Sequence, residues 1–145
     1  MNYTDIISKW KEKKIDSIEK LDQQLSNFRI TFAYNSGTIE NPQITYHATR
    51  EVFENGKVIN FCGDIQIIFE IENQKKCYNF LVPKIINKDP ITSDLIKKIH
   101  YQLMQGVYDE HRWQKGERPG HYKIHDYVIG KSNQGAHQEE VPDNL

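Results

Sequence analysis

The segment IDSIEKLDQQLSNFRITFAYNSGTIENP, residues 15–42, decides the expected fold because it carries a long apolar stripe. Its apolar residues recur at intervals of three, four or seven, the spacing that places side chains on one face of a helix. These residues are Ile15, Ile18, Leu21, Leu25, Phe28, Phe32 and Ile39. A residue before proline avoids the α conformation, so the helix is expected to end near Asn41. The segment predicts one long amphipathic helix whose last residue is Glu40.

A second interpretation ends this helix four residues earlier. Gly37 follows Asn35-Ser36 and could adopt the left-handed conformation that often terminates helices. A glycine inside a helix costs about 1 kcal/mol relative to alanine, whereas burial of Ile39 would gain roughly 1.5–3 kcal/mol. This balance favours a helix that continues to Glu40. Ser36 and Glu40 then lie four residues apart on one face of the final turn.

Residues 33–41 resemble the inhibitory motif of Fic domain proteins, which reads Ser/Thr-x-x-x-Glu-Gly/Asn. Fic proteins are protein adenylyltransferases, which move AMP from ATP to hydroxyl side chains of other proteins. In that family the motif glutamate holds an active-site arginine, which then cannot bind the γ-phosphate of ATP in the reactive pose. By this resemblance Glu40 is the autoinhibitory residue, and Ser36 and Asn41 are the supporting motif positions.

Composition and charge narrow the possible classes. The chain has 145 residues, enough for one domain, and its 19 basic and 20 acidic residues give a net charge of −1. This balance provides no basic surface for nucleic acid or an anionic membrane. No apolar run approaches the roughly 20 residues that span a bilayer, and the N-terminus lacks a signal-peptide pattern. Cys62 and Cys77 lack metal-ligand spacing, so we expect reduced thiols in a cytoplasmic, mainly α protein.

The chain divides into a helical lead-in, residues 1–14, and one larger unit, residues 15–145. Within that unit we expect the long helix over 15–41, a helical scaffold over 45–106, and a loop with a hairpin over 107–145. A short helix is expected over 4–12, and the scaffold should hold three helices. The residues that should begin, end or kink the scaffold helices are Thr45, Asn55-Gly56, Asp64, Pro83, Thr92 or Ser93, and Gly106.

The composition of the sequence changes after residue 106, where glycine, proline and charged residues become frequent. Tyr127-Val128-Ile129-Gly130 is typical of a short strand, residues 131–135 of a turn, and residues 136–141 of a partner strand. An isolated two-stranded hairpin is only marginally stable, so this hairpin should lean on the helical body or project from it.

The second half of the chain adds to the resemblance. Residues 91–103 look like the Fic segment that precedes the active site. Residues 116–130 look like the Gly-x-Tyr-Arg stretch that leads into the Fic flap. Lys123 stands in place of the arginine of that stretch. The lysine keeps the positive charge but lacks the planar guanidinium group that can donate two parallel hydrogen bonds. In Fic enzymes the flap is a hairpin that lies over the nucleotide and pairs with an extended segment of the target protein. The residues that the resemblance assigns to this docking edge are Tyr127, Val128, Ile129, Gly130 and Lys131, together with 136–139.

The catalytic motif of the family, His-Pro-Phe-x-Asp/Glu-Gly-Asn-Gly-Arg-x-x-Arg, does not occur in this sequence. In that motif the histidine accepts the proton of the target hydroxyl, the acid holds magnesium, and the glycine-rich turn binds the phosphates. The resemblance therefore covers about residues 28–145 and excludes the reaction centre. We assign no catalytic or metal-binding residue, and we expect the chain alone neither to bind ATP and Mg²⁺ well nor to transfer AMP.

Two other functions fit the same sequence. The chain could be a non-enzymatic helical module whose residues 15–41 bind and inhibit a separate Fic protein. Alternatively, it could be a helical domain that only binds proteins through its hairpin edge. In each alternative the chain binds a protein partner. A homo-oligomer is compatible with both alternatives, and neither involves nucleic acid or a membrane.

Overall fold

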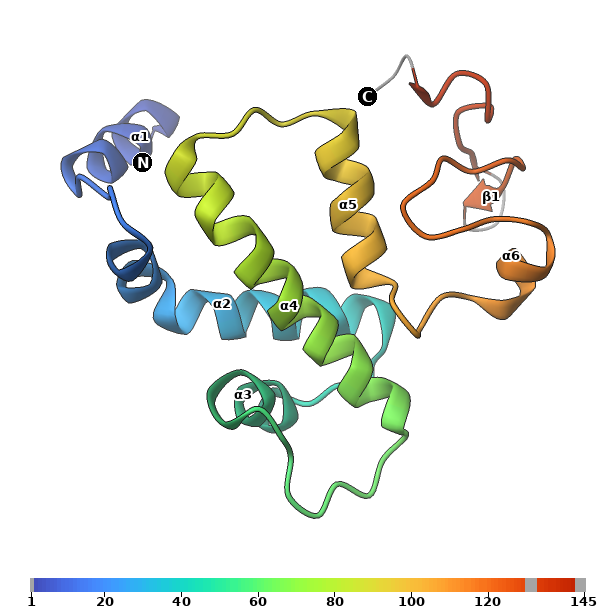
Figure 1. Ribbon diagram of the computed structural model, residues 1–145, viewed down its shortest axis with the longest axis horizontal. Coiled ribbons are helices and arrows are strands. Elements are labelled where there is room, and N and C mark those ends of the chain that lie inside the picture. Colours follow the sequence, from blue (N-terminus) through green and yellow to red (C-terminus); the bar gives the residue numbers. More distant parts are fainter. Residues whose placement is uncertain (1, 130–132, 143–145) are drawn as a thin grey trace.

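The computed structural model describes residues 2–129 and 133–142, and helices make up about 61% of the described residues (Figure 1). This confirms the prediction of a mainly α protein. The described elements are α1 (Tyr3–Glu12), α2 (Ile18–Glu40), α3 (Tyr46–Asn55), α4 (Ile65–Asn87), α5 (Ser93–Leu103), α6 (Glu110–Gln114), β1 (Val128–Ile129) and β2 (Asn133–Gln134).

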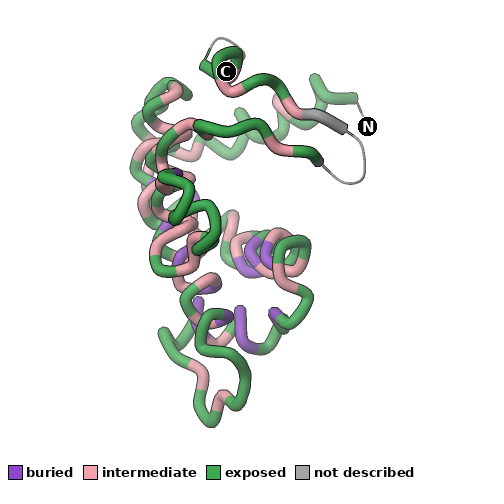
Figure 2. The backbone as a smooth tube through the Cα atoms, turned by 90° about the vertical axis from the view of Figure 1, so that its right-hand side faces the viewer, coloured by how far each residue is buried: buried purple, intermediate pink, exposed green. Residues whose placement is uncertain are grey.

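The helical body is built on the crossing of α2 and α4, with α3 packed against both of them (Figure 1). Helix α5 returns beside α4. The buried core lies where α2, α3 and α4 meet, and residues outside this meeting point are mostly partly or fully exposed (Figure 2). Its members are Ile30, Ala33, Ile44, Ala48, Val52, Phe53, Ile67 and Ile71. Burial of each large apolar side chain contributes roughly 1.5–3 kcal/mol, so this cluster holds the three helices together.

Helix α2 continues to Glu40, as predicted, and Asn41 is its C-cap residue. The alternative end at Gly37 is therefore wrong. The helix begins at Ile18 rather than Ile15, because the Ser17 side chain accepts a hydrogen bond from the backbone N–H of Lys20 at 3.3 Å. This contact satisfies one of the free donors of the first turn and sets the start of the helix.

The buried face of α2 differs from the predicted stripe. Phe28, Phe32 and Ile39 are 58%, 55% and 80% exposed. The helix packs through a face that contains Ile30, Ala33 and Gly37 together with Leu21, the one member of the predicted stripe that is buried. A Cβ atom added to Gly37 would lie 2.9 Å from Cδ1 of Ile44, so a larger residue there would require the Ile44 side chain to shift. Close packing at small residues, and not burial of Ile39, accounts for the glycine inside this helix.

The predicted N-caps of the scaffold helices are confirmed, whereas α5 ends at Leu103 with Met104 as its C-cap residue and not at Gly106. Thr45, Asp64 and Thr92 each accept a hydrogen bond from a backbone N–H in the first turn of α3, α4 and α5, at 3.1, 2.9 and 3.2 Å. Gly56 ends α3 with a φ of +73°, a conformation that glycine adopts without strain. These helix ends follow from hydrogen bonds between residues close in sequence.

Pro83 does not end α4, which continues to Asn87. Proline cannot donate to the carbonyl four residues earlier, which belongs to Asn79. Both Pro83 and Asn79 are exposed, so water can satisfy that carbonyl.

Asn73 is a buried polar residue of α4 that contacts the end of α5. It is 3% exposed, and its Nδ2 donates to the carbonyl oxygens of Leu103 and Gln105 at 3.1 and 2.8 Å, which fastens the end of α5 to α4.

The hairpin exists but pairs differently from the prediction. Strand β1 pairs with β2 in antiparallel register, with Val128 opposite Gln134. Residues 136–141 are not the partner strand, and the chain after β2 contacts Asp126 instead. Its carboxylate accepts the backbone N–H of Gln138 and contacts Nδ1 of His137, both at 2.8 Å.

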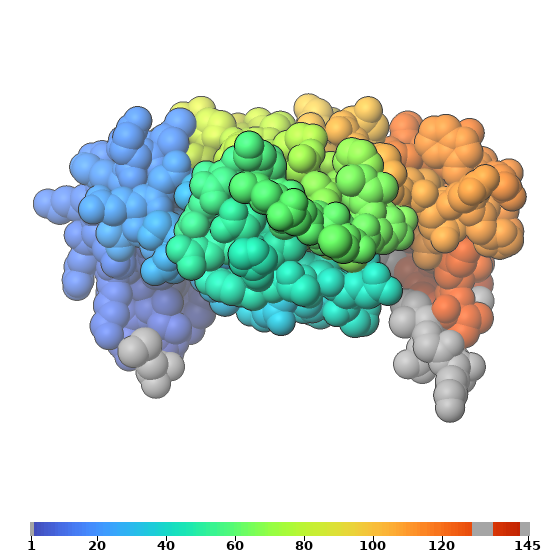
Figure 3. Space-filling view, turned by 90° about the horizontal axis from the view of Figure 1, so that it is seen from below, coloured from blue at the N-terminus to red at the C-terminus, as the bar shows by residue number. Residues whose placement is uncertain are grey.

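Residues 107–129 and 133–142 form a lobe at the opposite end of the molecule from α1 (Figure 3). The two cysteines are free thiols; Cys62 is exposed, and burial raises the pKa of Cys77. Among the helices of the described ranges, none combines the length and apolarity needed to cross a membrane.

Candidate functional site

The C-terminal end of α2 carries Ser36, Glu40 and Asn41 on its last turn. Ser36 is half-buried one turn before the exposed Glu40. The backbone N–H of Asn41 donates to the carbonyl of Gly37 at 2.8 Å and so completes the helix. In Figures 1 and 3 this helix end points toward the end of the molecule that carries residues 107–142, away from α1.

Asn41 fixes this helix end through its side chain. Its Nδ2 donates to Oε2 of Glu70 on α4 at 2.9 Å, and its Oδ1 accepts the backbone N–H of Gln43 at 3.1 Å. The other carboxylate oxygen of Glu70 accepts from Gln66 at 3.0 Å, so Glu70 is itself held in place. The turn after α2 is therefore tied to α4 at a residue directly next to Glu40.

The Glu40 carboxylate has no hydrogen-bond or ion-pair partner in the part of the chain that the structure describes. The last turn of α2 also contains no basic residue. The C-terminal end of a helix carries partial negative charge, and an acid there costs roughly 0.3–1 kcal/mol. Glu40 thus adds a full negative charge where the helix is already negative. The arrangement can attract a cation that approaches from outside the described chain.

A second group of residues organises the lobe beyond α5, and its centre is the buried carboxylate of Glu117. Glu117 is only 3% exposed. Its Oε1 accepts the backbone N–H of Ile124 at 3.2 Å, and its Oε2 lies 3.4 Å from the hydroxyl of Tyr108. A buried charge is costly unless it is hydrogen-bonded, so these contacts hold the loop before the hairpin against α6.

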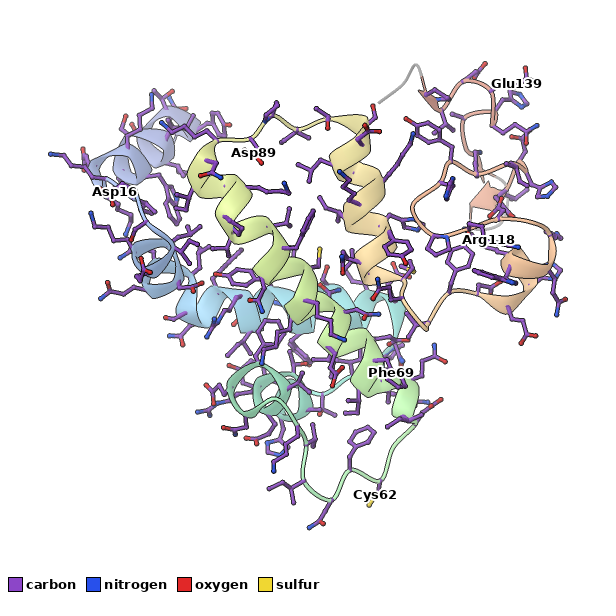
Figure 4. All side chains as sticks on the ribbon, in the orientation of Figure 1. Asp16, Cys62, Phe69, Asp89, Arg118 and Glu139 are labelled. Carbon is purple, nitrogen blue, oxygen red and sulfur yellow. The ribbon has the colours of Figure 1, made fainter. Side chains whose placement is uncertain are left out.

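Cations stacked on aromatic rings complete the lobe. The guanidinium of Arg112 lies 4.5 Å from the ring centre of Tyr127. The guanidinium of Arg118, which is labelled in Figure 4, lies 3.8 Å from the ring centre of Trp113. The Tyr127 hydroxyl is buried and forms no hydrogen bond with a residue of the described ranges. Contacts of this kind are worth about 0.5–1 kcal/mol at exposed sites, and here they anchor the start of the hairpin to α6.

The predicted docking edge is partly described. Tyr127 is half-buried under Arg112, and Val128 is 65% exposed in β1. Ile129 pairs with Asn133, whereas Gly130 and Lys131 lie outside the described residues. Residues 136–139 do not lie in a strand, so their assignment to a strand edge is wrong.

Lys123, which stands where the Fic pattern has arginine, binds within the lobe. Its Nζ donates to the carbonyl of Ala136 and lies 3.7 Å from Oδ1 of Asp126. A lysine ammonium can contact these two separate acceptors, since neither contact needs the planar guanidinium group of arginine.

The sequence patterns did not single out Glu117, Arg112 or Lys97 as functional candidates. Glu117 lies between Gly116 and Arg118, in a polar stretch without helical or strand periodicity. Its burial depends on the fold of the whole lobe, so no local signal could have revealed it. Comparisons of this chain with protein-family models, with curated proteins and with solved structures each returned no match.

Proposed function

We propose that the chain is the regulatory helix, scaffold and flap portion of a Fic-type protein adenylyltransferase, with Glu40 as its inhibitory residue. The observation that supports this proposal is the exposed Glu40 carboxylate on the last residue of a 23-residue helix, where it meets no partner among the described residues. A carboxylate in that position can accept two parallel hydrogen bonds from an arginine guanidinium. The helix end supplies further negative potential for the same cation.

Inhibition would follow from competition for one arginine. While Glu40 holds the guanidinium, that side chain cannot contact the γ-phosphate of ATP. The hydrogen bond from Asn41 to Glu70 keeps the helix end in a fixed place during this competition. None of the residues in this chain matches the family positions that hold ATP and Mg²⁺, so we derive no step of AMP transfer from it. The complete enzyme would use ATP and act in the cytoplasm.

The hairpin would supply the contact with the target protein. Val128 lies exposed in β1, and the ladder with β2 is only two residues long. A short, open ladder can accept an extended segment by strand addition, in which backbone hydrogen bonds give affinity. The anchoring of Tyr127 under Arg112 would hold this edge at a constant distance from the helical body.

A gain-of-activity experiment tests the assignment of Glu40. In a polypeptide that continues this chain through a Fic catalytic motif, Glu40→Gly should raise self-modification by labelled ATP, because the arginine is released. Glu12→Gly is the matched control, since Glu12 is also the exposed last residue of a helix. Equal label in the Glu40→Gly variant and the parent would contradict the assignment. The 145-residue chain alone should transfer no label.

A second candidate function is inhibition of a separate Fic protein by this chain. The observation that favours it is the pair of exposed rings on α2, Phe28 and Phe32, whose centres lie 5.7 Å apart. Ile39 extends this apolar surface toward Glu40 on the same helix. A polypeptide that carries the Fic catalytic motif would cover the rings while Glu40 holds its arginine. Co-purification with such a polypeptide, and its loss in Phe28→Ser/Phe32→Ser, would support this candidate over the first.

A further inference from the structure

A groove lies between α5, α6 and the loop over residues 117–123, and it encloses about 300 Å³. This volume is at the lower end of the range of small-molecule sites, roughly 300–1,000 Å³. The side chains that line it include five basic residues and one acid. These are Lys97, His100, Arg112, His121, Lys123 and Glu117. The whole chain carries a net charge of only −1, so the basic lining is a local feature.

The two cations that are most available in this groove are Lys97 and Arg112. Nζ of Lys97 lies 4.0 Å from the ring centre of Tyr122, and the guanidinium of Arg112 lies 4.5 Å from that of Tyr127. Neither cation forms an ion pair with an acid of the described ranges. An aromatic face attracts a cation but accepts hydrogen bonds poorly. The N–H groups of both side chains therefore remain available to a stronger acceptor.

His100 adds a neutral donor with a defined tautomer. Its Nδ1 accepts the backbone N–H of Gly120 at 2.9 Å, so in the neutral ring the proton is on Nε2. Burial, and to a smaller extent the charge of Arg112, lowers the pKa of His100 and favours this neutral form. The imidazole lines the groove, and its Nε2–H is a donor that does not depend on pH near neutrality.

The loop that closes the groove is held tightly against α5. Gly120 has a φ of +79°, and a Cβ atom there would lie 2.9 Å from Cβ of Tyr101 and 3.0 Å from the carbonyl oxygen of Lys97. Only glycine fits this position. The groove is thus formed before any ligand arrives, which reduces the ordering cost of binding.

The acidic side chains near the groove already have hydrogen-bond or ion-pair partners. Glu117 accepts hydrogen bonds from Ile124 and Tyr108, and Asp126 pairs with Lys123 and His137. Glu117 offsets one of the two available cations, and a net positive charge with several free donors remains. This combination suits a compact oxyanion rather than a cation or an apolar molecule.

We propose that this groove binds a phosphate group, either free or as part of a small phosphate monoester. Lys97 and Arg112 would donate to the phosphate oxygens from α5 and α6, and His100 would donate through Nε2–H. Charge-assisted hydrogen bonds of this kind are the strong ones in proteins. The inference stands apart from the proposed AMP transfer because it does not use Glu40. Arg112 also anchors Tyr127 of the hairpin edge, whereas Lys97 has no contact with that edge among the described residues, so Lys97→Gln separates the two proposals.

The test is a titration of the full chain with inorganic phosphate and with ribose 5-phosphate at constant ionic strength, followed by NMR. We expect saturable shifts of the His100 ring signals and of the Gly120 amide. Lys97→Gln and Arg112→Gln should each raise the dissociation constant at least fivefold. Lys98→Gln is the matched control, because it removes the same charge from the next residue of α5, outside this groove. Its affinity should equal that of the parent.

The two ligands separate the two sources of the phosphate group. Tighter binding of ribose 5-phosphate would assign the groove to an ester, and equal binding would assign it to inorganic phosphate. Shifts that do not saturate, or an equal loss of affinity in Lys98→Gln and Lys97→Gln, would overturn the proposal. Circular dichroism of each variant checks its folding, and Arg112→Lys keeps the charge if Arg112→Gln fails to fold. Arg112→Lys should then retain more affinity than Lys97→Gln.

Discussion

The side-chain amide of Asn41 donates a hydrogen bond to the Glu70 carboxylate at 2.9 Å and joins the end of α2 to the first half of α4. The two residues are 29 positions apart in the sequence. Asn41 also takes part in the backbone turn that follows the helix. The residue next to the proposed inhibitory carboxylate is therefore a fixed point of the fold, while Glu40 itself remains without a partner in the described residues.

Replacement of Asn41 by alanine should lower the free energy of unfolding by about 0.5–1.5 kcal/mol, the usual worth of one hydrogen bond. Asn41→Asp should cost more at neutral pH, because it places a second carboxylate beside Glu70. Urea denaturation at pH 7 measures both changes. If Asn41→Asp were as stable as the parent, the contact with Glu70 would contribute nothing to the free energy of unfolding in solution.

Replacement of Glu40 by glutamine should raise the free energy of unfolding by about 0.3–1 kcal/mol, because it removes a negative charge from the negative end of α2. Glu19→Gln is the control with the opposite sign. Glu19 lies in the first turn of the same helix, where a negative charge is favourable, so this variant should be less stable. Thermal or urea unfolding at low ionic strength compares them. Destabilisation by Glu40→Gln would reveal a partner for the carboxylate.

Replacement of the buried Asn73 by leucine should destabilise the protein by about 2–3 kcal/mol, since the carbonyls of Leu103 and Gln105 lose their donors. Asn79→Leu on the exposed side of the same helix should change stability by less than about 0.5 kcal/mol. Urea denaturation measures the difference. Hydrogen exchange should show faster opening at the C-terminal end of α5 in the Asn73 variant alone.

The chain after β2 should be held most firmly within a limited range of pH. The hydrogen bond from His137 is the main cause that lowers the pKa of Asp126 below 3.8, and the same contact raises the pKa of His137 above 6.5. A lowered carboxylate pKa gives stabilisation that is lost as the pH falls through that pKa. A raised histidine pKa gives stabilisation that is lost as the pH rises through that pKa. Protection should be highest between the two pKa values.

Hydrogen-exchange protection of the Gln138 amide, which donates to Asp126, reports this range. His137→Gln should remove the loss of protection at high pH, and Asp126→Asn should remove the pH dependence at both ends. The neighbouring charges of Lys123 and Glu140 act on the same pair and remain in both variants. Unchanged pH dependence in His137→Gln would show that another group titrates there.

Several parts of the fold could be predicted from the sequence because they depend on residues close together in the chain. Thr45, Asp64 and Thr92 cap their helices through hydrogen bonds that span two or three residues. Such contacts depend on the residues of one helix end and not on distant parts of the chain. The short strand that contains Val128 is likewise local. The continuation of α2 to Glu40 was predicted from burial of Ile39, but Ile39 is exposed and the helix packs at Gly37 instead.

Only the tertiary structure decided which face of α2 is buried, because that choice depends on how α3 and α4 pack against the helix. Apolar spacing predicted a stripe through Phe28 and Phe32, but packing selected the neighbouring face with smaller residues. The burial of Glu117 and the gathering of Lys97, His100 and Arg112 around one groove also join separate elements. Contacts between distant residues leave no periodic pattern in the sequence, so they become visible only when the helices are packed.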